Sequence, residues 1–377
     1  MTSRERVLST VERRVPDRVP LDLGSGKHCK LNLILYKKVL DYFGMHEDNI
    51  RIEKIQQPVY SSDAFYEKLQ CDVRAVYPDY VKKNAPDTKW EDDQYDYFRN
   101  AWGTEYRKPK DGGYFYDMSG YPLIGKEEEE DKLYVLPEVE YLDAKRADDV
   151  NRYHEEGFPV VLDATYGNGF LQTGPRVYGY EDWFMILAGE PERAEAFLDR
   201  LLEKKMEYWD KVTEVFGQSI DIVSELDDLG AQRGPLISEK MFRTLIKPYY
   251  KKLFPYIKKK TGAKLFMHCC GSIKQFIPDF IEVGVDILNP VQTSAENMEP
   301  HVLKSEFGKD ICFWGGGIDT QQTLPFGTPQ QIRDEVKRNI DVLGKDGGFV
   351  FAPIHNIQAT VPLENFIAMW EAFIEYR

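Results

Sequence analysis

Short apolar runs recur along the chain, and each is followed by a stretch with helical periodicity. The runs are rich in Val, Ile, Leu and Phe without strict alternation of apolar and polar residues, as expected for strands that are buried on both faces. Eight runs of this kind are predicted to form strands: residues 18–25, 71–79, 158–167, 219–230, 263–271, 285–292, 311–319 and 348–356.

The segments between the runs carry start and stop signals of helices. Pro191 stands at a first helical position, and apolar residues at helical spacing follow it until Gly217. Residues 328–331, Thr-Pro-Gln-Gln, have the sequence of a capping box, and a last helix is predicted after Pro362. Because eight strands alternate with helices, we expect an α/β fold, a single (β/α)8 TIM barrel domain over residues 1–377. A doubly wound open sheet is the alternative.

Residues 83–145 interrupt this alternation. The segment is rich in Tyr, Asp and Gly, and Asp111-Gly112-Gly113 is a hairpin-turn signal between two tyrosine-rich runs. We therefore predict an antiparallel insertion over the mouth of the barrel.

Charge and cysteine content exclude several classes of protein. The chain has 49 Lys and Arg against 63 Asp and Glu, a formal net charge of −14 at pH 7. Nucleic acids and anionic membranes are poor partners for such a chain, because both are bound through clustered basic residues. No run of 18 apolar residues is present, so no membrane span is expected. Five cysteines are sparse and odd in number, which fits a reducing cytoplasm. The oligomeric state stays open, a homodimer included.

The chemistry of a (β/α)8 barrel lies at the carboxyl ends of its strands. Polar side chains that follow the predicted strands are therefore candidates for contact with a substrate. These candidates are His28, Tyr166, Asn168, Gln232, Asn289, Gln292, Asp319 and Gln358.

A candidate metal site lies at the end of the fifth predicted strand. His268 and Cys270 are two residues apart, so their side chains share a face, and Cys269 faces the other side. An imidazole and a thiolate are two of the three protein ligands of a catalytic zinc site, and His355 after the eighth strand would complete the set. The alternative is that Cys270 is a small buried residue and that the histidines bind nearby backbone groups.

Three carboxylates follow the fourth predicted strand. Glu225 and Asp227 share a face of this strand, and Asp228 lies in the following turn. Such groups can act as a general base, bind a metal or orient a histidine ligand. Glu225 and Asp228 are therefore the candidate catalytic residues, and Glu225 is the reserve metal ligand if His355 points away. The alternative is a cluster that caps the next helix.

Most of the chain outside the insertion resembles the uroporphyrinogen decarboxylase superfamily. Residues 268–292, HCCGSIKQFIPDFIEVGVDILNPVQ, and residues 313–336, FWGGGIDTQQTLPFGTPQQIRDEV, are among the most similar segments. The resemblance implies a (β/α)8 barrel. Decarboxylases of this superfamily hold substrate carboxylates through an arginine-rich stretch near the N-terminus. The corresponding segment here is DLGSGKHCKLN, with Lys27 as the cationic side chain at the turn, so tetrapyrrole decarboxylation is disfavoured.

The other branch of the superfamily consists of corrinoid-dependent methyltransferases. They bind zinc through His-x-Cys on the fifth strand and a Cys near the end of the last strand. His268 and Cys270 match the first pair, and His355 in the sequence APIHN takes the third position. The resemblance therefore implies a zinc-dependent methyltransferase that works with a separate corrinoid (cobalamin) protein.

The substrate implied is a small methylated compound: an O-methyl ether, a methylthiol or a methylamine. Substrate choice is expected to depend on Lys27, His28 and Cys29, and on aromatic side chains of the insertion. These aromatic side chains are Trp102, Tyr106, Tyr114 and Tyr116, for which mutual packing at the rim is an equal alternative. A decarboxylase of a tetrapyrrole carboxylate and a non-catalytic binding protein on the same barrel are the alternative functions.

Overall fold

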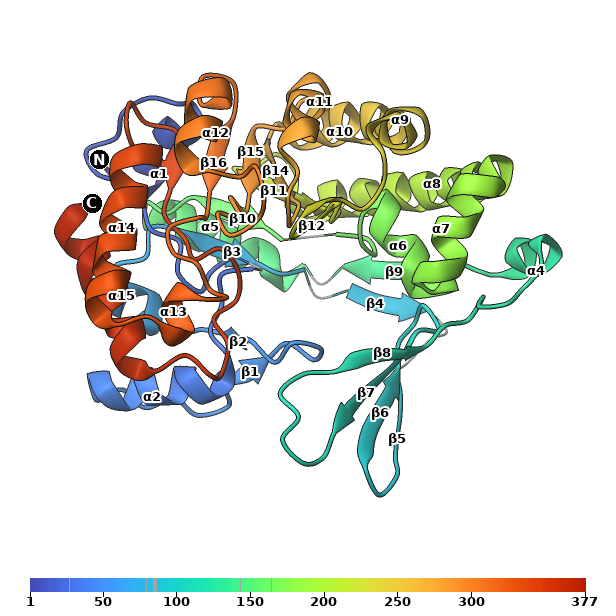
Figure 1. The fold of residues 1–377 in the computed structure, drawn as a ribbon, viewed down its shortest axis with the longest axis horizontal. Coiled ribbons are helices and arrows are strands. Elements are labelled where there is room, and N and C mark those ends of the chain that lie inside the picture. The colour runs from blue at the N-terminus through green and yellow to red at the C-terminus, as the bar shows by residue number, and fades with distance from the viewer. Residues whose placement is uncertain (27, 79, 84–86, 143, 164) are drawn as a thin grey trace.

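The structure of the protein is a computed structural model that describes residues 1–26, 28–78, 80–83, 87–142, 144–163 and 165–377. Its centre is a curved parallel sheet with the strand order β17-β16-β15-β14-β11-β10-β3 (Figure 1). These strands are β3 (Arg74–Val76), β10 (Val160–Leu162), β11 (Ile222–Leu226), β14 (Lys264–His268), β15 (Ile287–Asn289), β16 (Cys312–Trp314) and β17 (Phe349–Val350). Each of them lies inside one of the predicted runs, from the second run at residues 71–79 to the eighth at residues 348–356.

The first predicted run closes this sheet into a barrel. Leu21 forms a parallel bridge with Phe351, which directly follows β17. On its other side, the backbone N–H of Asp72, just before β3, donates to the carbonyl of Leu21 at 2.8 Å. Residues 18–25 therefore occupy the eighth position, between the first and last strands of the sheet. This confirms the (β/α)8 barrel and excludes the open doubly wound sheet.

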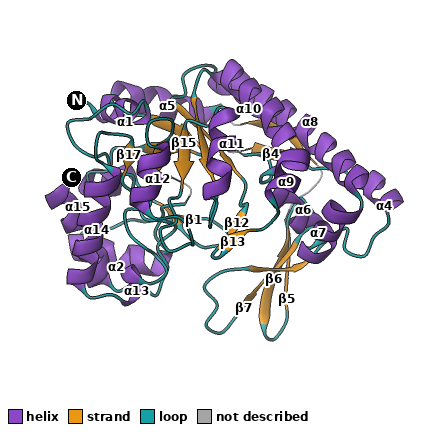
Figure 2. Ribbon diagram, turned by 45° about the horizontal axis from the view of Figure 1, so that its top comes forward, coloured by secondary structure: helices purple, strands orange, loops and turns teal. Residues whose placement is uncertain are grey.

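Helices cover the outside of the barrel (Figure 2). The sequence signals that start them are confirmed: Pro191 opens the longest helix, and Thr328 and Gln331 form a capping box. The helices are α1 (Ser3–Val11), α2 (Leu33–Phe43), α3 (Asp63–Lys68), α4 (Glu128–Leu133), α5 (Lys145–Glu155), α6 (Phe170–Tyr178), α7 (Tyr180–Gly189), α8 (Pro191–Phe216), α9 (Glu239–Met241), α10 (Lys247–Thr261), α11 (Ile277–Glu282), α12 (Pro300–Phe307), α13 (Thr323–Phe326), α14 (Pro329–Leu343) and α15 (Leu363–Tyr376), with a π turn η1 (Phe242–Ile246) and a 3₁₀ turn η2 (Lys274–Phe276). Among the described helices, none combines the length and apolar character needed to cross a bilayer.

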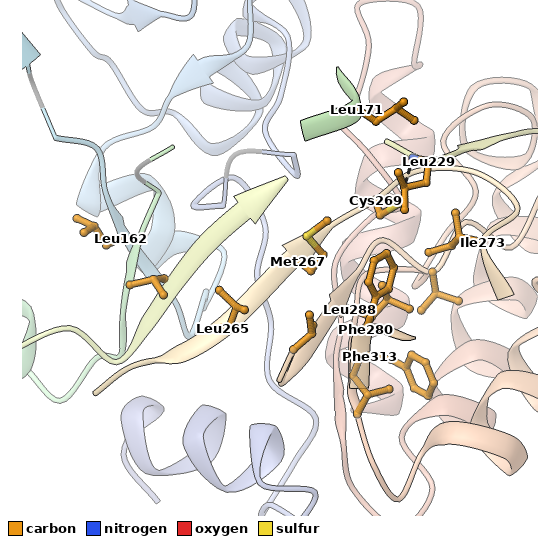
Figure 3. Packing of buried hydrophobic residues seen from close by; sticks show 14 of the residues in the cluster. Leu162, Leu171, Leu229, Leu265, Met267, Cys269, Ile273, Phe280, Leu288 and Phe313 are labelled. Carbon is orange, nitrogen blue, oxygen red and sulfur yellow. Dashed lines mark hydrogen bonds between the residues drawn. The ribbon is translucent and has the colours of Figure 1, made fainter. Parts of the chain in front are cut away.

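Alternate residues of each strand face two different apolar layers. Leu265, Met267 and Cys269 face the helices, where they join a large cluster that Figure 3 shows in part. Phe266 faces the barrel interior, in a smaller cluster that includes Trp314. This alternation with a period of two decides which side chains of β14 reach the centre of the barrel.

The predicted antiparallel insertion is present. Residues 88–120 form a four-stranded sheet that extends away from the body of the barrel (Figure 1). Its strands are β5 (Thr88–Glu91), β6 (Tyr95–Arg99), β7 (Glu105–Pro109) and β8 (Asp117–Gly120). Asp111-Gly112-Gly113 lies in the connection between β7 and β8, as predicted. The remaining short strands pair antiparallel: β1 (Arg51–Ile52) with β2 (Val59–Tyr60), β4 (Tyr80–Lys83) with β9 (Glu138–Leu142), and β12 (Gly230–Ala231) with β13 (Gly234–Pro235).

Candidate metal centre

His268 is the last residue of β14 and points into the barrel mouth, with 2% of its surface exposed. Its Nδ1 lies 2.6 Å from Oδ1 of Asn289, and Nδ2 of Asn289 donates to the carbonyl of Trp314 at 2.8 Å. Because the second bond fixes the orientation of the amide, Oδ1 must accept the proton of Nδ1. The lone pair of the neutral ring is therefore on Nε2, as in a histidine prepared to bind a metal. Asn289, predicted to contact substrate, orients His268 through this bond.

Cys270 and Asp228 lie close to Nε2 of this imidazole. Sγ of Cys270 is 3.3 Å from Nε2 of His268, and Oδ1 of Asp228 is 3.8 Å from the same nitrogen. The backbone N–H of Cys270 donates to Oδ1 of Asp228 at 2.9 Å, which holds the two residues together. Burial and the charge of Asp228 raise the pKa of the Cys270 thiol well above its usual value. A coordinated divalent cation reverses such an effect, since it binds the thiolate.

The rings of His28 and His355 lie close to the same imidazole. The rings of His28 and His268 are stacked with centroids 3.5 Å apart, and the ring of His355 lies 5.2 Å and 5.7 Å from them. Burial, together with the neighbouring His268, lowers the pKa of His355 to about 4. His355 is therefore neutral at pH 7, which is the form of imidazole that binds metals.

The predicted ligands are thus brought together through His268, but in two sets. The ligand atoms of His28, His268 and His355 lie within 4.8 Å of one another, and so do those of Asp228, His268 and Cys270. His355 does not turn into the helical layer, so it remains available. Imidazole, thiolate and carboxylate are all donors that zinc accepts, and each set of three matches the number of protein ligands in a catalytic zinc site, so the residues fit the metal. His28 and Asp228 are the additional ligand candidates, and the contact of His28 with His268 was not anticipated.

Glu225 does not reach this centre. Its carboxylate accepts from Nζ of Lys205 and from Nε1 of Trp209, both at 2.9 Å and both on α8. Asp227 likewise faces helices: it accepts from the backbone N–H groups of residues 171 and 172 at the start of α6 and from the Tyr250 hydroxyl. Burial raises the pKa of Asp227 to about 6. The two acids do share a face of β11, but it is the face covered by helices, so the helix-capping alternative describes Asp227.

A small cavity of about 20 Å³ lies inside the barrel beside His28 and His268. The buried acidic residues Asp22, Asp163 and Glu225 are among its lining residues, and no role was predicted for Asp22 from the sequence. Asp22 accepts from Nε1 of Trp314 at 3.0 Å and from the N–H of Gly26 at 3.2 Å, and Asp163 accepts from the Ser224 hydroxyl at 2.9 Å. The position of Asp22 directly after the bridge residue Leu21, within the first predicted run, is the signal that could have identified it.

A larger cleft of about 390 Å³ lies next to the metal centre. Cys270 and His355 line it, together with three of the residues predicted to contact substrate. These are Gln232, Gln292 and Gln358. Thr320, Gln321 and Asn356 also line this cleft, so the turn after β16 reaches it through Thr320 and Gln321, next to the predicted residue Asp319.

The other predicted substrate residues stabilise the surroundings of the site. The Tyr166 hydroxyl donates to the carbonyl of Pro137 at 2.6 Å, which ties the insertion to the barrel. The N–H of Asn168 donates to Thr173 at 3.3 Å at the start of α6. Oδ1 of buried Asp319 accepts from the N–H of Gln321 at 2.8 Å and shapes that turn. Lys27 lies outside the described residues.

The aromatic side chains of the insertion pack mainly on one another. Tyr106 stacks on Phe98 with ring centroids 4.8 Å apart, and Tyr116 lies 5.0 Å from the same ring. The ring of Trp102 lies 5.2 Å from that of Tyr166. None of these rings lines the inner cavity or the cleft as the described residues form them.

The architecture and the sequence can be compared with known proteins. No curated protein sequence matches the chain. Among solved structures, a methyltransferase from Methanosarcina mazei has a similar fold, with a TM-score of 0.63 and 17% sequence identity over 100% of this chain and 99% of that chain. Native xylanase 10B from Thermotoga maritima matches with a TM-score of 0.40 and 11% identity, over 63% of this chain and 81% of that chain. Residues 170–376, more than half of the sequence, match the family model of uroporphyrinogen decarboxylase (URO-D). The chain therefore belongs to the uroporphyrinogen decarboxylase family.

Proposed function

We propose that the protein is a zinc-dependent methyltransferase that moves a methyl group between a small methylated compound and a separate corrinoid protein. The observation that carries the proposal is the pair formed by Nε2 of His268 and Sγ of Cys270, 3.3 Å apart at the barrel mouth. The neutral imidazole of His355, whose ligand atoms group with those of His28 and His268, would supply a third ligand. The methyl compound would be an O-methyl ether, a methylthiol or a methylamine.

Zinc held by His268, Cys270 and His355 would supply a Lewis acid for the heteroatom that carries the methyl group. Asn289 keeps Nε2 of His268 directed at the metal position through its bond to Nδ1. Asp228 holds the backbone of Cys270, and its carboxylate, partly exposed, is placed to accept a proton from a substrate at the mouth. The stacked ring of His28 closes the inner side of the site.

The decarboxylase alternative needs cationic side chains that face the substrate, because tetrapyrrole acids carry several carboxylates. Among the described residues that line the inner cavity and the cleft, none is Lys or Arg. This favours a substrate without carboxylates. We also propose a cytoplasmic location, which the sparse free cysteines support.

Metal content separates these functions. Elemental analysis of the purified full chain should find about one zinc per chain, and Cys270→Ala should lose most of it. Cys269→Ala is the matched control, because the neighbouring thiol faces the helices and accepts from the N–H of Leu229. Methyl transfer to reduced cobalamin should follow the metal. A chain that binds no zinc after reconstitution, and that acts on tetrapyrrole carboxylates, would overturn the proposal.

A further inference from the structure

The cleft next to the metal centre has an unusual lining for an acidic protein. Apart from Cys270 and His355, its polar side chains are amides and one hydroxyl, and none of the described lining residues carries a formal charge at pH 7. The amides come from four segments that are distant in sequence. They are Gln232, Gln292, Gln321, Asn356 and Gln358.

Part of this amide surface is already held in place by the protein. Nε2 of Gln232 donates to Oε1 of Gln321 at 2.5 Å, and the N–H of Gly271 donates to Oε1 of Gln292 at 2.7 Å. Nε2 of Gln358 donates to the carbonyl of Asn356 at 3.2 Å. These bonds orient the amides and leave each of the three glutamines Gln292, Gln321 and Gln358 with one amide atom that bonds no other described residue. Those atoms are Nε2 of Gln292, Nε2 of Gln321 and Oε1 of Gln358.

The cleft therefore offers both donors and acceptors but no charge. A primary amide on a ligand matches it, because an amide also donates through nitrogen and accepts through oxygen. A carboxylate matches it poorly, because it only accepts and would lose its hydration without meeting a cation. Cleft volume limits the occupant as well: about 390 Å³ accommodates a group of small-ligand size or one edge of a macrocycle.

We propose that this cleft binds the amide-bearing rim of the corrinoid. The inference rests on the proposed function and identifies which face of the barrel the cofactor of the partner protein meets. A corrin ring carries acetamide and propionamide groups around its edge, whereas porphyrin-type acids carry carboxylates. Because Cys270 and His355 line the same cleft, a corrin edge bound there places the ring beside the metal centre, where the methyl group is exchanged.

The test compares two corrinoids that share the ring but differ at the rim. Dicyanocobinamide carries amides, and dicyanocobyrinic acid carries carboxylates. Cyanide on both faces of the cobalt prevents its direct binding to Cys270, so the measured affinity reports the rim. Titration of the zinc-loaded full chain, followed by visible absorption, should give a dissociation constant about tenfold lower for cobinamide, the size expected for one to two hydrogen bonds.

Two variants locate the contact. Gln321→Glu and Gln358→Glu each keep the shape of the side chain and should weaken cobinamide binding about fivefold or more. Gln322→Glu is the matched control: it is the next residue, exposed, and outside the cleft lining, so it should leave binding unchanged. Circular dichroism of each variant confirms that the fold is retained.

Equal affinity for the two corrinoids, or equal effects of Gln321→Glu and Gln322→Glu, would overturn the assignment of the cleft. Methyl transfer to free cobalamin is measured in parallel. If transfer occurs without rim discrimination, the inference about the cleft is wrong and the proposed function stands. If neither zinc binding nor transfer occurs, the proposed function itself fails.

Discussion

The buried ion pair of Lys205 and Glu225 allows a direct test of the effect of a buried acidic residue on the stability of the barrel. Nζ of Lys205 lies 2.9 Å from Oε2 of Glu225, and the two side chains are 0% and 3% exposed. Removing one partner of such a pair leaves an uncompensated buried charge, which costs about 3–5 kcal/mol. We therefore expect Lys205→Met and Glu225→Gln each to lower the free energy of unfolding by about this amount, a large fraction of a typical total of about 5–15 kcal/mol.

The double variant should cost much less than the two single variants added together. With Met at 205 and Gln at 225, no charge remains buried, and the Gln oxygen can still accept from Nε1 of Trp209. The remaining loss is that of an unsatisfied amide group, about 1–3 kcal/mol. The exposed pair Lys204–Glu207 on the same helix is the control, and breaking it should cost no more than about 1 kcal/mol.

Urea unfolding measures these differences. Tryptophan fluorescence and circular dichroism must give coincident transitions, because a chain of 377 residues can unfold through intermediates. Single variants that cost less than 1 kcal/mol, or a double variant that equals the sum, would refute the assignment of a stabilising pair. If a single variant does not fold, the double variant still decides, since it should fold. Loss of zinc from the folded double variant would restore Glu225 as a ligand of the metal.

Burial lowers the pKa of His355 from 6.5 to about 4, so between these values the unfolded chain binds a proton that the folded chain does not. The metal-free protein should therefore lose stability, up to about 3 kcal/mol, as pH falls from 6.5 to 4. The raised pKa of Asp227 acts in the opposite direction. The readout is therefore the difference in unfolding free energy between the unaltered protein and His355→Asn at each pH. Parallel pH profiles of the two proteins would contradict the lowered pKa of His355. Serine substitutions of Cys269 and Cys312 should leave zinc content and activity within a few-fold, because both thiols are buried away from the metal centre; a large loss of zinc would show an error in strand register. His28→Ala should weaken the apparent affinity for the methyl donor, and an unchanged ranking and affinity over a panel of donors would remove His28 from the site.

The barrel could be predicted because its signals are local. Each run of apolar residues identified a strand, and the alternation of side chains placed Cys269 outward and Cys270 inward. Capping at Thr328 and the turn at Asp111-Gly112-Gly113 also depend on a few adjacent residues. Such features follow from short stretches of sequence, so a single sequence is sufficient to recognise them.

The composition of the site could be predicted only in part, because it depends on contacts between distant segments. The rule of alternation that placed His268 inward also places Glu225 outward, but the ion pair with Lys205 becomes evident only when α8 is packed on β11. The stacking of His28 on His268 joins a turn near the N-terminus to the end of β14, and no local pattern indicates it. Orientation of His268 by Asn289 likewise requires the register of β14 and β15.

The bridge of Leu21 to Phe351 and that of Leu31 to Ile357 join segments near opposite ends of the sequence. His28 and His355 are presented by these joined segments, so the three-histidine cluster cannot form on a ribosome that has not yet released the last strand. At about 5–20 residues per second, the first strand and the histidine after it wait for tens of seconds before their partners emerge. A metal held by the three histidines could therefore be bound only after the last strand has emerged, and Cys270 would stay exposed from its own synthesis until then, about 85 residues later.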